Sequence, residues 1–240
     1  MSEIKEEKEE SLVSHLEALR TTLIKCFVAV GIVLPFAFYF SPKVLNFLIK
    51  ILISDNNITL NYFAPMEIFI LQIKLALLLA VSAAFPYIIK NIWDFVVPAL
   101  YEHERKLIQS TVIISSCLFL SGIIFCLFII LPLIINFGIS FGSQQVSPMW
   151  GISNLMSLSL TLAFTFGLMF QVPLITHALI KADIISYDAV SSKRRYVIVI
   201  LLIISALLTP PDIVSQILMF IPTYLLFELG LLFSKKEQND

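Results

Sequence analysis

The sequence predicts an all-α, polytopic membrane protein with six transmembrane helices, both termini on the cytoplasmic side and a concave bundle. Apolar residues make up 58% of the 240 residues, the mean hydropathy is +0.93, and only 14% of the residues are charged. This composition lies far from that of water-soluble domains. In addition, the apolar residues gather in six stretches, and lysine and arginine crowd every second gap between them.

Most of the six stretches are long enough to cross a bilayer, because a helix needs about 20 apolar residues to span ~30 Å of hydrocarbon. The fifth would rise only ~20 Å, which predicts either local bilayer thinning or a short helix sheltered by its neighbours. Pro86, Pro132 and Pro173 are expected to kink or end their helices and so to shape a concave bundle. The predicted helices occupy residues 22–41, 67–87, 107–131, 155–176, 196–208 and 213–232.

The distribution of cations predicts the orientation. Three of the seven polar segments hold only Lys43 and Lys50 between them, whereas the others are rich in lysine and arginine. By the positive-inside rule, the N-terminal segment 1–21, the tail 233–240 and the two cation-rich connections face the cytoplasm. Residues 1–10 are acidic and polar, so we expect a disordered tail and no cleavable signal peptide. The whole chain, 1–240, is then one domain in the cytoplasmic membrane.

Motifs for chemistry are missing from the sequence. There is no glycine-rich nucleotide loop and no His-Glu-x-x-His zinc motif. Residues 138–142 match the Gly-x-Ser-x-Gly pattern of serine hydrolases, but they are expected in an outward loop, away from every histidine. Cys26, Cys117 and Cys126 fall inside apolar stretches and are expected to be free thiols. We therefore predict no enzyme activity, no cofactor, no metal and no nucleic-acid partner.

Polar groups near or within the bilayer are the functional candidates, because lipid penalises them. Gln171 lies ~15 Å along a helix from Lys181, close to the midplane, and either forms a helix-to-helix hydrogen bond or has a functional role. Glu228 lies ~10 Å inside the membrane. Glu67 and Lys74 share a helix face, but their ~10 Å separation is too long for direct pairing.

Three short segments outside the apolar stretches carry the other candidates. In residues 101–106, Glu104 precedes the third helix and either complements its dipole or binds a ligand. Near the N-terminus, Ser14 and Glu17 have capping-box spacing. On the outward side, Pro210 and Pro211 predict a tight hairpin, in which Asp212 can cap the sixth helix.

Taken in order, these clusters resemble the TatC family, the multi-spanning receptor subunit of the twin-arginine protein translocase. The resemblance runs from about His15 to Phe233, and the order and spacing of several motifs carry it. The motifs are His15-Leu16-Glu17-Ala18-Leu19-Arg20, Pro65-Met66-Glu67-Ile68-Phe69 with Lys74, Pro98-Ala99-Leu100-Tyr101-Glu102-His103-Glu104-Arg105, Phe166-Gly167-Leu168-Met169-Phe170-Gln171-Val172-Pro173, Thr209-Pro210-Pro211-Asp212 and Tyr224-Leu225-Leu226-Phe227-Glu228.

The resemblance implies a non-enzymatic receptor that recognises signal peptides bearing two adjacent arginines. It also implies TatA- and TatB-type single-helix partner subunits, a homo-oligomer within a larger complex, and transport of folded proteins driven by the proton-motive force. The arginine pair would bind at the cytoplasmic face. The residues implied for this site are Leu16, Glu17, Arg20, His103, Glu104 and Arg105, and those implied for intramembrane or partner contacts are Glu67, Lys74, Gln171 and Glu228.

The chain departs from the family pattern at two positions. The family usually has a glutamate where this chain has Ala18, so either Glu17 takes its place or Glu104 carries more of the selectivity. Many family members carry glutamate at the position of Gln171, and an amide cannot relay protons. A different class, a small-solute secondary transporter, is the alternative. It is disfavoured because the sequence lacks related halves and has a neutral group at the midplane.

Overall fold

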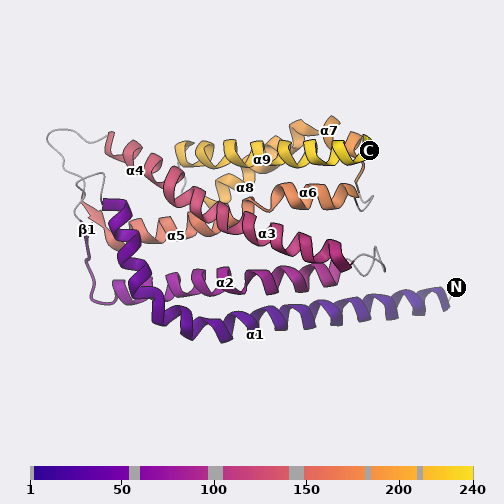
Figure 1. Ribbon diagram of the computed structural model, residues 1–240, viewed down its shortest axis with the longest axis horizontal. Helices are drawn as coiled ribbons and strands as arrows, with labels where there is room; N and C mark the ends of the chain where they lie inside the picture. Colours follow the sequence, from indigo (N-terminus) through magenta and orange to yellow (C-terminus); the bar gives the residue numbers. More distant parts are fainter. Residues whose placement is uncertain are drawn as a thin grey trace.

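The computed structural model is a bundle of long helices that run roughly side by side (Figure 1). It describes residues 3–53, 60–96, 105–140, 149–181, 185–209 and 213–239. The elements are α1 Glu3–Ile53, β1 Leu60–Asn61, α2 Glu67–Val96, α3 Arg105–Phe125, the π-helix η2 Cys126–Ile130, α4 Leu131–Ser140, β2 Trp150–Gly151, α5 Ile152–Met169, α6 Val172–Lys181, α7 Tyr187–Ser192, α8 Arg194–Leu208 and α9 Ile213–Asn239.

Of the residues that the structure describes, 91% are helical, which confirms the predicted all-α class. Five helical segments of the described chain are long and apolar enough to cross a membrane. The predicted fifth span corresponds to α8, which has 15 residues and is not among them. The five segments are Leu16–Ile51, Glu67–Phe95, Ser110–Ser140, Ile152–Lys181 and Ile213–Leu232.

Helix α1 is much longer than the predicted first span. It begins at Glu3, so the expectation of a disordered tail at residues 1–10 was wrong from that residue onward. Residues 3–10 consist largely of glutamate and lysine, which are good helix formers, and no glycine or proline interrupts the chain before Gly31. Because the helix is continuous through Ser14 and Glu17, these residues cannot form the predicted capping box.

Prolines change the helices in three different ways. Helix α1 contains Pro35 and Pro42 and turns sharply before its C-terminal end (Figure 1). The π-helix comes directly before Pro132, with the Leu131 amide donating to the Cys126 carbonyl, and this wider turn lets the helical path continue past the proline. In the fourth stretch, α5 ends at Met169 and α6 starts at Val172, next to Pro173.

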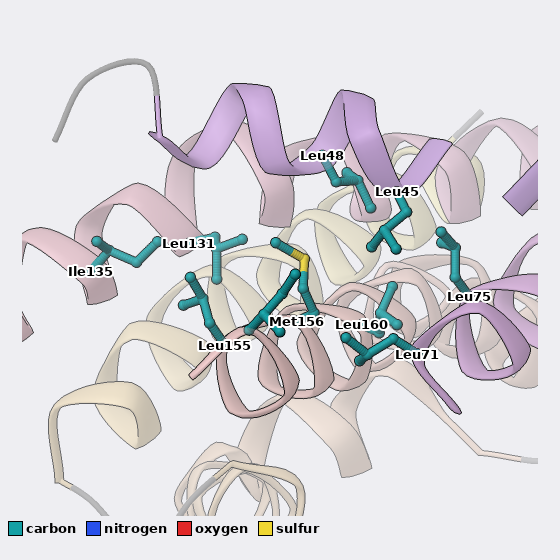
Figure 2. Packing of buried hydrophobic residues seen from close by; sticks show 10 residues of the cluster. Leu45, Leu48, Leu71, Leu75, Leu131, Ile135, Leu155, Met156 and Leu160 are labelled. Atoms are coloured by element: carbon teal, nitrogen blue, oxygen red, sulfur yellow. The ribbon is translucent and has the colours of Figure 1, made fainter. Parts of the chain in front are cut away.

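The largest buried cluster lies where α1, α2, α4 and α5 meet (Figure 2). Met156 of α5 is completely buried and points into the space between α1 and α4. Around it pack leucine and isoleucine side chains from all four helices. The labelled residues of this cluster are Leu45, Leu48, Leu71, Leu75, Leu131, Ile135, Leu155, Met156 and Leu160.

Two connections that are far apart in the sequence meet in a short parallel β-bridge, which the sequence did not predict. Leu60 of β1 pairs with Trp150 of β2, and Asn61 pairs with Gly151. The indole of Trp150 also packs over Gly138 at the end of α4, where an added Cβ would lie 3.3 Å from the ring. Residues 138–142, which match the Gly-x-Ser-x-Gly pattern, were expected in an outward loop. Gly138 and Ser140 instead belong to the end of helix α4.

Candidate functional site

One end of the bundle gathers the ends of several elements that carry the predicted binding residues. The N-terminal part of α1, the C-terminal ends of α2, α6 and α9, and the N-terminal end of α3 all lie at this end (Figure 1). Residues 16–20 belong to α1, and Arg105 opens α3. The fold therefore brings the N-terminal motif and the start of the third helix to the same end of the molecule.

The α1 part of the predicted site is open to a ligand. Leu16, Glu17 and Arg20 are all exposed. The Glu17 carbonyl accepts a hydrogen bond from the Thr21 hydroxyl at 2.9 Å, as expected inside a helix. Leu16 and Arg20 are four residues apart and share one face, whereas Glu17 is turned by about 100° from Leu16. Helix α1 thus presents one apolar and one cationic group together, with the carboxylate to the side.

The second half of the predicted site lies between α2 and α3. Helix α2 ends at Val96 and α3 begins at Arg105. His103 and Glu104 fall in the intervening connection, outside the described residues. The fold thus locates the two ends of this connection, and the roles of its residues remain predictions.

Gln171 is buried at the break between α5 and α6 and is bound to α3. Its side-chain nitrogen donates to the Ser115 carbonyl at 3.1 Å, and its side-chain oxygen accepts from the Ser115 hydroxyl. The Gly167 carbonyl is a further acceptor at 3.5 Å. Gln171 is 5% exposed and Ser115 is fully buried. Of the two interpretations left open by the sequence, this geometry supports the helix-to-helix hydrogen bond.

Glu228 has a partner that sequence reasoning missed. Its Oε1 lies 3.1 Å from Nε of Arg194, and the Tyr224 hydroxyl donates to the same oxygen at 2.8 Å. In the sequence, Arg194 is one of the cations of the cation-rich connection before the fifth apolar stretch. The two residues are 34 positions apart, and no local spacing pattern could have paired them. The bond joins the first residue of α8 to α9.

Glu67 and Lys74 bind different partners. The Glu67 carboxylate accepts a hydrogen bond from the Phe63 amide at 3.2 Å, which fixes the chain entering α2. Lys74 donates through Nζ to the Ser157 hydroxyl at 2.9 Å and so connects α2 to α5. In the described structure both groups therefore contribute to contacts within the bundle.

The predicted hairpin is only partly described. Pro210, Pro211 and Asp212 lie outside the described residues, so the proposed cap of α9 is not placed. The preceding residue, Thr209, is buried at the end of α8, and its hydroxyl donates to the Ser205 carbonyl at 2.8 Å. The Thr209 amide donates to the same carbonyl at 2.9 Å, so both bonds hold the C-terminal end of α8.

Across the residues that the structure describes, no three histidine, cysteine, aspartate or glutamate side chains come together as a metal-binding group. The three cysteines are free. The described structure instead has an exposed rim on α1, formed by Leu16, Glu17 and Arg20, next to an extended apolar surface.

Comparison with known proteins decides the family. The model of the family described as "Sec-independent protein translocase protein (TatC)" matches residues 14–222. The chain belongs to the TatC family. A TatC protein of Haemophilus influenzae is 35% identical over 95% of this chain and 90% of its own length. One from Carboxydothermus hydrogenoformans is 33% identical over 96% of this chain and 95% of its own.

Solved TatC structures share the fold. The chain matches the "Crystal Structure of Twin Arginine Translocase Receptor- TatC in DDM" with a TM-score of 0.84 and 33% identity, covering 92% of this chain and 99% of that one. Family membership confirms the resemblance found in the sequence. This TatC-family chain is a multi-pass membrane protein, and it is a non-enzymatic subunit of a protein translocase.

Proposed function

We propose that this TatC-family protein is the receptor that binds twin-arginine signal peptides at the cytoplasmic face of the membrane. With TatA- and TatB-type single-helix subunits, it would move folded proteins across the membrane using the proton-motive force. Several copies would assemble within a larger complex. The observation that carries the proposal is that the exposed Leu16 and Arg20 of α1 lie at the same end of the bundle as the C-terminal end of α2 and the N-terminal end of α3.

The carboxylates proposed for this end of the bundle can bind a pair of arginines. A guanidinium group presents a planar fork of donors that matches a carboxylate, and charge-assisted hydrogen bonds contribute about 1.5–3 kcal/mol each. Lysine is a point charge without this fork, so carboxylates can discriminate two arginines from two lysines. Glu104 is the carboxylate that we assign to this role, and Glu17 is the alternative if it takes the place of the family glutamate missing at Ala18. Leu16, Arg20, His103 and Arg105 complete the proposed site.

The orientation follows from the cations. Lysine and arginine crowd the end that carries the N-terminal part of α1, so we place this end, both termini and residues 1–21 and 233–240 in the cytoplasm. The membrane would be the cytoplasmic membrane, crossed six times by one domain. Helix α8 is the short fifth crossing, and its Ile203 and Leu207 are exposed on the outside of the bundle. This exposure favours local thinning of the bilayer over shelter by neighbouring helices.

The polar residues that we place within the membrane have a structural role in the proposed receptor. Glu67, Lys74, Gln171 and Glu228 each bond within the described bundle, and we propose that they hold the receptor in shape for its partner subunits. Pro210, Pro211 and Asp212 would form an outward hairpin that docks those partners.

Signal-peptide capture tests the proposal. The full-length protein in detergent is mixed with a photo-reactive twin-arginine peptide, and a twin-lysine peptide of the same length is the control. Glu104→Gln should lower the crosslinking yield about tenfold, since about 1.4 kcal/mol corresponds to a factor of ten. Glu102→Gln, two residues away, should lower it less.

Each result bears on a different part of the proposal. Equal yields for the Glu104→Gln and Glu102→Gln proteins would remove Glu104 from the site. Equal capture of the twin-arginine and twin-lysine peptides by the unmodified protein would contradict the receptor function itself.

A further inference from the structure

Unused hydrogen-bond donors gather where the first part of α2 meets α5, at the end of the bundle opposite the N-terminal part of α1 (Figure 1). The exposed Lys74 of α2 donates through Nζ to the Ser157 hydroxyl of α5 at 2.9 Å. An ammonium group has three donors, so two remain, and the Ser157 hydroxyl keeps its own proton to donate. Among the described residues, neither side chain makes another hydrogen bond.

Asn154 adds an amide to this donor cluster of Lys74, Ser157 and Asn154. It is exposed and lies three residues before Ser157 on α5, so the two side chains are neighbours on one helix face. Its amide has two donors and makes no hydrogen bond with another described residue. Asn154 Nδ2 lies 3.6 Å, and Phe63 Cε2 lies 3.1 Å, from the point that a Cβ on Gly151 would occupy. The Phe63 ring therefore borders the cluster.

A carboxylate lies on the same side of α2, nearer the end of the bundle. Glu67 opens α2, and its Oε2 accepts from the Phe63 amide at 3.2 Å. A carboxylate has about four lone-pair positions, so it can accept further hydrogen bonds. Glu67 and Lys74 are about 10 Å apart along the helix and within about 20° of each other around it. One face thus presents an anionic group above a cationic donor cluster.

The depth of the cluster matches the head-group region of a bilayer. Tyr62, which precedes α2, is 66% exposed, and tyrosine is enriched at membrane–water interfaces. Lys74 lies about 10 Å below the start of α2, within a helix long enough to span the membrane. Side chains of a helix lean toward its N-terminus, so the long stem lets the ammonium rise toward the interface. A cation here is costly unless it meets an anion, and phospholipid phosphates are the anions at this level.

We propose that this face binds one phospholipid of the leaflet that we place outside. Its phosphate accepts charge-assisted hydrogen bonds from the donor cluster, and an amino head group, as in phosphatidylethanolamine, donates to Glu67. The order of charges fits, because the phosphate of such a lipid lies nearer the acyl chains than the amine does. The acyl chains run along α5 over Phe164 and Leu168, which are 37% and 45% exposed. The proposal does not depend on the receptor function.

Lipid retention by the full-length protein tests the site. The protein is released from nanodiscs of phosphatidylethanolamine and phosphatidylglycerol, and bound lipids are counted by native mass spectrometry. Lys74→Met should weaken retention of phosphatidylethanolamine about tenfold, because it removes charge-assisted hydrogen bonds. Lys74→Arg keeps the charge and should stay within about threefold.

Lys43 provides the matched control for the loss of a lysine. It is exposed on the C-terminal part of α1 and makes no hydrogen bond with another described residue. Lys43→Met should change lipid retention less than about twofold. Equal retention by the Lys74→Met and Lys43→Met proteins would overturn the proposal.

A second substitution decides the question if the Lys74→Met protein does not fold. Asn154 makes no hydrogen bond with another described residue, so Asn154→Ala should keep the elution volume and thermal unfolding of the unmodified protein. It should weaken retention of phosphatidylethanolamine about fivefold, through the lost amide donors. Thr161→Ala is the control, since Thr161 is exposed on the same face of α5 but about 10 Å deeper. Equal retention by these two proteins would overturn the proposal.

The head-group preference tests the order of charges. The unmodified protein should retain phosphatidylethanolamine over phosphatidylglycerol, which has no amine. Glu67→Gln should remove this preference, because the amide oxygen can still accept from the Phe63 amide but carries no charge. A preference that is absent from the unmodified protein, or unchanged by Glu67→Gln, would overturn the assignment of the amine to Glu67.

Two further arms separate other occupants from a lipid. Inorganic phosphate is added to the lipid-free protein in detergent, and an adduct with free phosphate but none with phospholipid would overturn the proposal. Co-purification of a single-helix partner subunit is the other arm. If Lys74→Met lowers it and leaves lipid retention unchanged, the cluster binds protein and the proposal fails.

Discussion

Nε of Arg194 lies 3.1 Å from Oε1 of Glu228, so one ion pair ties the start of α8 to the middle of α9. The Tyr224 hydroxyl shares the same carboxylate oxygen at 2.8 Å. Arg194 is 44% exposed and Glu228 is 25% exposed, and Arg194 opens α8 after the cation-rich connection that we place on the cytoplasmic side, so we expect water to screen the pair. The ion pair therefore fixes the position of α8 against α9 but contributes little to the free energy of unfolding.

Replacing Arg194 by alanine should therefore have a small effect. We expect Arg194→Ala to lower the free energy of unfolding by less than about 1 kcal/mol, the usual range for exposed ion pairs. Thermal unfolding of the purified protein measures this. Arg195→Ala is the neighbouring control, because Arg195 instead stacks over the Tyr196 ring at 5.2 Å. A loss of several kcal/mol for Arg194→Ala alone would show that the pair is buried from water.

Gln171→Leu should destabilise the protein and leave Ser115 without its side-chain acceptor. Interhelical hydrogen bonds in membranes contribute about 0.6 kcal/mol on average and up to about 1.7 kcal/mol. We expect a loss in this range by thermal unfolding. Combining Gln171→Leu with Ser115→Ala should cost less than the sum of the two single changes, because both remove the same bond.

The neighbouring Ser116 is the control for this cycle, since its hydroxyl bonds only the Val112 carbonyl of its own helix. Ser116→Ala and Gln171→Leu should be additive. If the Gln171→Leu protein is stable but fails to export, the packing role is insufficient and Gln171 acts in transport.

Gly122→Ala should be strongly destabilising. A Cβ at Gly122 would lie 2.6 Å from the carbonyl oxygen of Phe166, a backbone atom of α5 that cannot move alone. Overpacking of this kind costs about 1–3 kcal/mol. Gly31→Ala is the matched control on α1, where a Cβ meets nothing within 4 Å. It should be neutral or stabilising by up to about 1 kcal/mol, because alanine favours a helix. Equal effects in thermal unfolding would contradict the α3–α5 close approach.

Glu17→Gln should leave binding of the twin-arginine peptide within twofold of the unmodified protein. The reason is that α1 is continuous here, so Glu17 is turned by about 100° around the helix from Leu16, to the side of the face that Leu16 and Arg20 share. Peptide affinity and export rate are the measurements, and Glu104→Gln is the comparison. A tenfold loss for Glu17→Gln would instead show that Glu17 substitutes for the family glutamate missing at Ala18.

Composition and local pattern were sufficient to predict the helical class and the family. Apolar stretches of membrane length are visible in one dimension, because each spanning helix satisfies its own backbone hydrogen bonds and needs only its own residues to be apolar. Motifs such as residues 98–105 and 209–212 are likewise local. One wrong prediction is local too: the capping box at Ser14 and Glu17 fails because residues 3–10 are good helix formers and α1 already begins at Glu3.

The sequence by itself determined which segments are apolar enough to enter a bilayer, and its charges predicted their orientation. Only the tertiary structure decided which side chains meet. Ser115 and Gln171 are 56 positions apart, and Arg194 and Glu228 are 34 apart. Leu23 and Ile92, which line one groove between α1 and α2, are 69 apart. Such contacts depend on how helices cross and turn about their axes, and helix packing sets those angles rather than the apolar character of any one segment.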